Sequence, residues 1–469
     1  MIRSLLKYAP VQVFAALSVF VLIAIQTRFL TPESYGVLAV AMVILELVRA
    51  FSTQWLNTSM LRLYPSCSEP EQQQLAQSIS FTAIVGSLIG FICIAGALYV
   101  YGELSTSLLL VLCFLLAVKS LFQYQLEFSR LNERLIAYRQ ATLLQSISSV
   151  VISSISLYFV ATMESALLAL TISYGLGAIV LGYPHRPKKH NATLKRLFTY
   201  GMPVMLAGGI SVLSGRIDRL FIAHFNGMSE TGIYAAQANL LMGVLGLVFM
   251  MIAMPLYPNL AKCSDDHPRL FLEHKTYLHL LLTLTVPALL GLGLLQDEII
   301  RFFLGELYLS DSGVLFWVLA LAIYLINFKG HFLDHGLQFL LQTRKLLWIS
   351  VIGLVASVLL LPLMLNMFGV IGAAWTLLFV SFLVAVLSFI SSLRSGYHYS
   401  ISSDGIKVLI SAFFMGIYLY QIKNIALSLS PVVLLAFYVI SSMLFYGLCL
   451  WVFNAFNVRQ RLFSIWRLD

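Results

Sequence analysis

The sequence predicts an all-α polytopic membrane protein with about fourteen transmembrane helices, and two observations support this fold class. First, 60% of the 469 residues are hydrophobic, only 10% are charged, and the mean hydropathy is +0.90. A soluble domain carries roughly 25% charged residues because water must solvate its surface. Second, apolar stretches of about twenty residues recur over residues 10–453. About twenty residues are needed to cross the hydrocarbon core of a bilayer as a helix.

A helix is the expected spanning element because it satisfies its own backbone hydrogen bonds, which lipid cannot do. A closed β-barrel would instead show strands of about ten residues with alternating polarity. Residues 351–365 show no such alternation. Arg3 and Lys7 precede the first apolar run, as in a signal peptide, but that run continues to about Ile25 without a small-residue cleavage site. We therefore interpret it as an uncleaved first span.

Charged residues and turn residues divide the chain into fourteen predicted spans. These are residues 8–27, 34–58, 77–101, 107–127, 140–161, 164–183, 199–224, 231–257, 276–296, 313–338, 345–366, 370–392, 406–423 and 431–453.

The loop charges predict the orientation, because cytoplasmic loops keep an excess of Lys and Arg. With a cytoplasmic N-terminus, the outer segments hold only Arg28, Arg301 and Lys423. The acidic residues Glu33, Glu103, Glu164, Glu230, Asp297, Glu298, Glu306 and Asp311 also fall outside. The inner segments hold Arg3, Lys7, Arg62, Arg130, Arg134, Arg139, Arg186, Lys188, Lys189, Lys195, Arg196, Lys262, Arg269, Lys275, Arg344, Lys345, Arg394, Arg459, Arg461 and Arg467. Both termini are thus predicted in the cytoplasm. Cations beside membrane ends also account for the net charge of +9 without a nucleic-acid partner.

Two stretches resemble each other at a spacing of about 193 residues, which indicates an internal duplication. Residues 8–11 (YAPV) open the first span and residues 200–204 (YGMPV) open the seventh. Residues 31–39 (TPESYGVLA) lead into the second span, as residues 229–235 (SETGIYA) lead into the eighth. These two spans end in LYP, at residues 63–65 and 256–258. Six spans separate the copies, so both halves are predicted to be parallel.

The duplication predicts the domain organisation. Residues 1–183 form an N-terminal six-helix bundle, and residues 184–198 form a basic cytoplasmic linker. Residues 199–395 form a second six-helix bundle, and residues 396–469 carry two additional helices and a basic tail.

Four cations within the predicted spans mark candidate binding residues, namely Arg49, Arg216, Arg219 and Lys329. A charge at the centre of a span costs about 2.5–3.5 kcal/mol on insertion scales, so such residues are expected to face the bundle interior or water. Glu46 lies three residues before Arg49 and can pair with it on one helical face, with or without a role in transport.

On the seventh span, Arg216 and Arg219 share a face while Asp218 points elsewhere and neutralises only part of their charge. The two arginines therefore predict a solvated cationic surface.

The tenth span carries Lys329, His331, Asp334 and His335. The last three can share a face, and histidine titrates near neutral pH, so they are candidates for proton coupling, as Asp218 and Glu46 are. An Asp–His contact that only satisfies buried polar atoms explains the pattern equally well. Lys329 has no acidic partner three or four residues away. A metal site is disfavoured, because a fourth ligand is not indicated.

Interior cations suit an anionic cargo, because guanidinium and ammonium groups bind phosphates and a low-dielectric path strengthens the attraction. Polar amides in the spans can bind sugar hydroxyls or bridge two helices. They are Gln123, Gln125, Gln237, Asn239, Asn327 and Gln338.

These motifs together resemble the polysaccharide transporter, or O-antigen repeat-unit flippase, family of the multidrug/oligosaccharidyl-lipid/polysaccharide exporter superfamily. The resemblance rests on residues 28–36 (RFLTPESYG), 215–219 (GRIDR) and 230–235 (ETGIYA), and on a topology shared over nearly the whole chain. Arg216 and Arg219 match the family motif, whereas Arg49 and Lys329 follow from charge alone. The final two spans resemble those of fourteen-span members, lipid II flippases included, where they form a lipid-facing groove.

The resemblance implies a two-bundle transporter that flips undecaprenyl-diphosphate-linked oligosaccharide to the periplasmic face of the bacterial inner membrane by alternating access. It implies no catalytic residues, metal or cofactor, and H⁺ or Na⁺ as the coupling ion. A glycan polymerase and a chain-length regulator are candidate partners.

Three alternatives remain. A multidrug exporter of the same fold tends to use acidic interior residues, and this interior is more cationic. A membrane-embedded glycosyl polymerase or ligase exposes a large outer loop, whereas the longest outer loop here, residues 297–312, is short, and motifs of known catalytic sites are absent from the sequence. An uncoupled lipid scramblase also fits the sequence.

Overall fold

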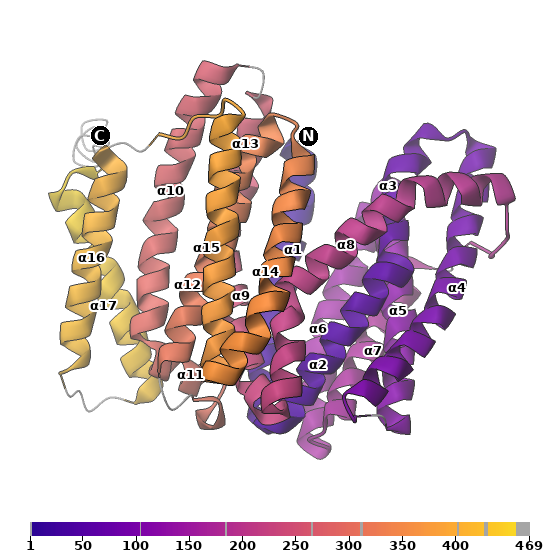
Figure 1. The fold of residues 1–469 in the computed structure, drawn as a ribbon, viewed down its shortest axis with the longest axis horizontal. Helices are drawn as coiled ribbons and strands as arrows, with labels where there is room; N and C mark the ends of the chain where they lie inside the picture. Colours follow the sequence, from indigo (N-terminus) through magenta and orange to yellow (C-terminus); the bar gives the residue numbers. More distant parts are fainter. Residues whose placement is uncertain are drawn as a thin grey trace. The chain divides into compact units, whose positions relative to one another are not determined.

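The computed structural model describes residues 2–103, 105–182, 185–263, 266–309, 313–400, 403–425 and 430–455. The described residues form helices and connecting turns and contain no strand (Figure 1). Fourteen of their helices are long and apolar enough to cross a membrane, which confirms the predicted fold class. The chain divides into two compact units. The first runs to Ala236 and includes Leu354–Ala373, and the second comprises Gln237–Gly353 and the chain from Ala374 onward.

The first unit is built from the N-terminal helices. They are α1 (Ile2–Phe29), α2 (Pro32–Arg49), the π-helical turn η1 (Ala50–Gln54), α3 (Trp55–Leu63), the 3₁₀ turn η2 (Tyr64–Ser66), α4 (Glu69–Val100), α5 (Thr106–Leu131), α6 (Leu135–Phe159), α7 (Met163–Leu181) and α8 (Asn191–Asn226). Helix α6 packs against α1 and α7, α7 packs against α5, and α8 packs along α2, η1 and α3.

The helix starts of the first unit follow from local sequence. Thr31, Ser105 and Thr162 each precede a helix and accept a hydrogen bond from the backbone N–H three residues later. Ser68 and Glu71 form a capping box at the start of α4. Each such cap contributes about 0.5–2 kcal/mol by satisfying an otherwise unpaired N–H group. Polar breaks in the sequence therefore become short, defined connections between spans.

The second unit contains most of α9 (Met228–Lys262) and the helices that follow. They are α10 (His267–Leu294), α11 (Gln296–Phe303), the 3₁₀ turn η3 (Glu306–Tyr308), α12 (Val314–Phe328), the π-helical turn η4 (Lys329–Leu333), α13 (Asp334–Phe339), α14 (Thr343–Phe368), α15 (Val370–Arg394), α16 (Ser403–Lys423) and α17 (Pro431–Val452). Helices α14 and α15 each contribute a segment to the first unit.

The two C-terminal helices are packed onto the second unit. Helix α16 contacts α10 and α17, and Figure 1 shows α16 and α17 beside α10. Buried Ala412, Met415 and Tyr446 form the contact cluster, and the Tyr446 hydroxyl donates to the Thr283 carbonyl at 3.0 Å. These helices are thus held by apolar burial and by a hydrogen bond to α10.

The duplicated motif forms a reciprocal contact within the first unit. Gly36 on α2 and Gly232 at the start of α9 face each other, so that a Cβ on either would lie 3.0 Å from the other's amide nitrogen. A Cβ at Gly36 would collide with the Met228 carbonyl oxygen, and one at Gly232 with the Pro32 carbonyl oxygen. Met228 lies four residues before Gly232, and Pro32 lies four residues before Gly36. The two motif copies therefore meet backbone to backbone, which only glycine permits.

Replacing Gly36 by alanine should destabilise the protein, because the added methyl group forces α2 and α9 apart. We expect a loss of about 1–3 kcal/mol, as for overpacked cores. Gly232→Ala should cost a similar amount, and the double variant should cost less than the sum of the two, because both changes disrupt the same contact. Thermal unfolding of the purified protein in detergent measures the effect.

Gly96→Ala on α4 is the matched control, since a Cβ at that position has no neighbour within 4 Å. Alanine is the better helix former, so this control should be neutral or slightly stabilising. Equal unfolding temperatures for Gly36→Ala and Gly96→Ala would contradict the close contact.

Candidate functional site

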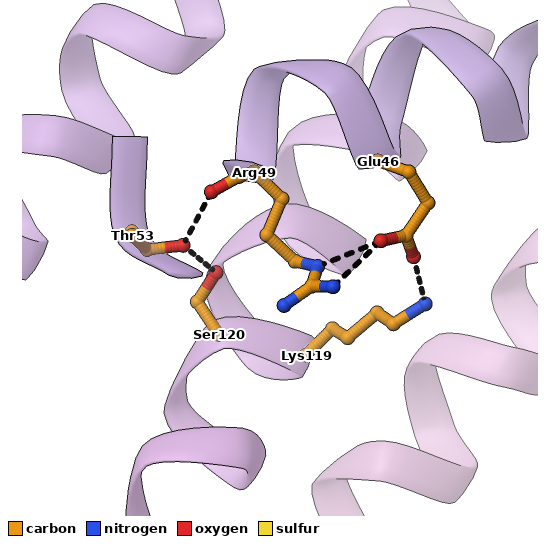
Figure 2. Close-up of polar contacts among 5 residues, drawn as sticks. All are labelled: Glu46, Arg49, Thr53, Lys119 and Ser120. Atoms are coloured by element: carbon orange, nitrogen blue, oxygen red, sulfur yellow. Dashed lines mark hydrogen bonds and ion pairs between the residues drawn. The ribbon is translucent and has the colours of Figure 1, made fainter. Parts of the chain in front are cut away.

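A charged cluster lies inside the first unit, on helices whose surroundings are apolar. Glu46 on α2 accepts hydrogen bonds from Arg49 Nε at 3.0 Å and Arg49 Nη2 at 2.7 Å through Oε2. Its other oxygen, Oε1, accepts a hydrogen bond from Lys119 Nζ on α5 (Figure 2). The three side chains are only 10–12% exposed. One carboxylate therefore binds two largely buried cations, and the predicted Glu46–Arg49 pair is confirmed.

Lys119 was not predicted as a member of this cluster. Its ammonium also lies 5.3 Å from the centre of the Tyr174 ring on α7, within the range of a cation–π contact. The sequence carried a signal for it, because Lys119 is a lone cation within the fourth predicted span, as Lys329 is within the tenth. The two lysines lie six spans apart, which is the separation between corresponding helices of the duplication.

A π-helical turn fixes the geometry beside the ion pairs. Turn η1 begins directly after Arg49, and Thr53 Oγ1 within it donates to the Arg49 carbonyl at 3.4 Å. The same hydroxyl shares a hydrogen bond of 2.8 Å with Ser120 Oγ, next to Lys119 in the chain (Figure 2). π-helical turns inside α-helices often occur at functional sites. Here the Thr53–Ser120 hydrogen bond holds η1 against α5, about one helical turn after the ion-paired residues.

Helix α8 contributes the arginines of the predicted motif. Arg216 is partly exposed, whereas Arg219 is 4% exposed and Asp218 is 8% exposed. Arg216 is therefore the more accessible of the two arginines, and Arg219 is not part of an exposed surface. Asp218 Oδ1 accepts from the Arg219 backbone N–H at 2.8 Å, and Oδ2 accepts from the Tyr234 hydroxyl at 2.5 Å. The aspartate is thus held by its own helix and by the start of α9.

Arg216 connects the two groups of charges electrostatically. It interacts with Arg219 and Asp218 on α8 and with Glu46 and Arg49 on α2. With Lys119, the cluster contains four cations and two carboxylates, so two positive charges are in excess. Charges in a low-dielectric interior interact more strongly than in water. The cluster is consequently suited to bind an anion.

The second unit holds another buried ion pair. Lys329 Nζ lies 2.8 Å from Asp334 Oδ2, and Ser388 Oγ donates to Asp334 Oδ1 at 2.6 Å. The sequence expectation of an unpartnered Lys329 is therefore wrong. The pair is five residues apart, and the π-helical turn η4 (Lys329–Leu333) brings these positions together where an α-helix would not.

The two histidines of this span lie in aromatic surroundings. The His331 ring stacks on Phe249 with centres 5.8 Å apart. The His335 ring lies 4.9 Å from the Tyr257 ring and 5.5 Å from those of Tyr277 and His274. The hydrogen bonds of Asp334 go to Lys329 and Ser388, so the predicted Asp–His grouping is replaced by an Asp–Lys–Ser grouping. Among the described residues, no three His, Cys, Asp or Glu side chains are grouped to hold a metal ion.

Several of the candidate sugar-binding amides make contacts within the protein. Gln125 donates to the Gly182 carbonyl, and Gln237 donates to the Tyr308 carbonyl at 2.9 Å. Gln338 accepts from the Tyr257 hydroxyl at 3.0 Å. These three side chains bridge separate segments of the protein, which favours a bridging role for them over sugar binding.

The described helices thus form a polytopic membrane protein with largely buried cations in its interior. The profile of the polysaccharide biosynthesis protein family matches residues 25–312, and the chain belongs to that family. This finding, together with the fold, confirms the resemblance inferred from the sequence motifs.

Two solved transporter structures share the fold. The lipid II flippase MurJ, in an inward closed conformation, has a TM-score of 0.76 at 15% identity, with 97% of this chain and 99% of that chain covered. An inward-facing multidrug resistance MATE family transporter of the MOP superfamily has a TM-score of 0.58 at 13% identity, with 80% and 93% covered. An uncharacterised membrane protein of Methanocaldococcus jannaschii is 24% identical over 240 residues, or 50% of this chain. This chain spans about half of that relative, 46% of its length.

Glu46→Gln should strongly destabilise the protein, because it leaves Arg49 and Lys119 buried without their carboxylate. Removing one partner of a buried ion pair typically costs about 3–5 kcal/mol. Adding Lys119→Met to Glu46→Gln should restore part of the loss, since it removes one of the two unpaired charges. Chemical or thermal unfolding of the purified variants measures both effects.

Glu306→Gln is the control, because Glu306 pairs with Arg301 at 3.7 Å and both side chains are largely exposed. Exposed pairs contribute about 0–1 kcal/mol. A Glu46→Gln loss no larger than that of the control would show that the Glu46 cluster does not support the fold.

Proposed function

We propose that this protein is a flippase that moves undecaprenyl-diphosphate-linked oligosaccharide, an O-antigen, capsule or exopolysaccharide repeat unit, from the cytoplasmic to the periplasmic leaflet by alternating access. The observation that carries the proposal is the cluster of Arg49, Lys119, Arg216 and Arg219 around two carboxylates inside the first unit. Membership of the polysaccharide biosynthesis protein family and the MurJ-like fold support the substrate class.

The chemistry of the cluster fits a diphosphate better than a drug cation. Guanidinium forks bind phosphate oxygens with two hydrogen bonds, and a lysine ammonium adds a point charge. A cation exporter would need a carboxylate free to meet its cargo. Here Glu46 is bound by Arg49 and Lys119, and Asp218 by Tyr234 and the Arg219 backbone. The internal carboxylates are therefore already engaged, and the excess charge is positive.

Glu46 suggests how binding and ion coupling are linked. A substrate diphosphate competes with Glu46 for Arg49 and Lys119. Once the substrate has displaced it, Glu46 has lost the cations that keep it ionised and can bind H⁺. Asp218, His331, Asp334 and His335 remain further candidates for coupling. Under this mechanism H⁺ is the simpler coupling ion, with Na⁺ as the alternative. No catalytic step is required, and the protein acts as a transporter rather than an enzyme.

The proposed setting follows from the sequence. The protein lies in the bacterial inner membrane with both termini in the cytoplasm, and the two six-helix bundles of residues 1–183 and 199–395 provide the alternating halves. Residues 184–198 link them on the cytoplasmic side, and residues 396–469 add the last two helices and the tail. The lipid-linked glycan is the primary partner, and a glycan polymerase and a chain-length regulator act on the product.

Alanine at Arg216, Arg219 or Lys119 should block surface glycan assembly while the protein still inserts into the membrane. Each change removes one charge-assisted interaction, worth about 1.5–3 kcal/mol, so transport should fall about tenfold or more. Lys329→Ala should also lower glycan export, because it removes an interior cation of the second unit. Lipid-linked repeat units should accumulate on the cytoplasmic face, which glycan blots and lipid extraction quantify alongside protein abundance.

Arg301→Ala is the matched control, because that side chain is 60% exposed in a surface pair with Glu306. Its transport should be normal. Arg216→Lys should retain partial transport because it keeps the charge but loses the fork. Normal glycan export by the alanine variants would refute the cationic path.

A further inference from the structure

An apolar slot lies within the first unit between α2–η1–α3, α4 and α8. Its volume is about 520 Å³, and aromatic rings of Phe51, Trp55, Tyr101 and Phe198 are part of its lining. This volume falls within the range of small-molecule sites, which is about 300–1,000 Å³. The slot is therefore large enough for a ligand, and its walls are those of a hydrocarbon site.

The slot extends along the membrane-spanning direction of its helices. Its lining on α4 runs from Thr82 to Tyr101, which at about 1.5 Å per residue is about 28 Å. The hydrocarbon core of a bilayer is about 30 Å thick. A volume of about 520 Å³ spread over that length leaves width for a single chain. The slot is therefore as wide as one lipid chain, and its volume holds only part of an undecaprenyl tail.

Packing contacts define the slot along its length. Gly86 lets α4 approach the π-helical turn η1, because a Cβ there would collide with the Ser52 carbonyl oxygen. The Tyr101 hydroxyl donates to the Leu220 carbonyl at 3.2 Å and joins α4 to α8 at one end. Trp55 and Phe198 have ring centres 5.3 Å apart at the other end. Contacts between the lining helices thus bound the slot at both ends.

A cation lies on the helical stripe that lines the slot. Phe198, Met205 and Leu220 line it from α8, and Arg216 is eleven residues after Met205 and four before Leu220. These spacings place all four side chains on one face of the helix. Arg216 is also the residue that interacts electrostatically with the Glu46 cluster. The slot and the anion-binding cluster therefore share an arginine at their boundary.

We infer that the slot holds the part of an isoprenoid tail next to the diphosphate of a polyprenyl-diphosphate carrier, that the diphosphate binds at Arg216, and that the rest of the tail lies in the bilayer. A polyprenyl diphosphate has one chain and a strongly anionic head, which match a single-chain slot beside a cation. A bilayer phospholipid has two chains on one head and matches it less well. The inference rests on the proposed function and places this part of the tail in the first unit, away from the C-terminal helix pair.

The test is photolabelling of the full-length protein in nanodiscs with a diazirine-bearing polyprenyl diphosphate, followed by mass spectrometric mapping. Adducts should map to residues 44–55, 82–101 or 198–220, and unlabelled undecaprenyl diphosphate should reduce them. Ala97→Trp fills the slot and should lower labelling there about tenfold or more. Ile92→Trp, on the same helix, is the control, because Ile92 is 75% exposed and is not part of the lining.

Three results would overturn the inference. They are adducts confined to α16 and α17, equal labelling by a diazirine-bearing phosphatidylglycerol that undecaprenyl diphosphate does not displace, and unchanged labelling in a folded Ala97→Trp variant. Labelling of the unmodified protein decides the site even if Ala97→Trp does not fold. The readout is binding, so it is independent of transport. If Arg216→Ala retains glycan export while the slot is still labelled, the proposed cationic path fails and the lipid site stands.

Discussion

The rest of the site depends on one constraint, which is that a buried carboxylate must neutralise cations that lipid cannot solvate. Glu46 meets it by binding Arg49 and Lys119 from two helices, and the π-helical turn after Arg49 fixes α2 against α5 through Thr53. An ion pair of this kind is weak support for stability in itself, because desolvation offsets much of the attraction. The proposed function gives a reason other than stability for these charges to be present, which is the binding of an anion.

The fold could be predicted from the sequence because bilayer thickness sets the length of each apolar run, and several spans begin directly after Ser or Thr. Within the site, only contacts between residues close in sequence could be predicted. Glu46 and Arg49 pair three residues apart, as helical geometry dictates. The Lys119 contact required the tertiary packing of α5 on α2. The Lys329–Asp334 pair required a π-helical turn, which sequence periodicity does not report.

The duplicated motif has a structural role that its sequence alone left open. Its glycines, Gly36 and Gly232, bring α2 and α9 into backbone contact, and Tyr234 of the second copy donates a hydrogen bond to Asp218. Asp218 lies between the two arginines of α8. The motif thus positions the helix that carries Arg216. A change in the contact between α2 and α9 would alter the environment of the arginines without any change to them.

The balance of charge also bears on how a flippase would release its cargo. A site with unpaired cations would bind a diphosphate tightly and hold it. In the proposed mechanism the substrate replaces Glu46 as the partner of Arg49 and Lys119, so the loss of the Glu46 ion pairs offsets part of the free energy of binding. A transport site must bind its substrate well enough to admit it and weakly enough to release it, as in ion channels. An internal carboxylate that reclaims the cations after release satisfies both requirements.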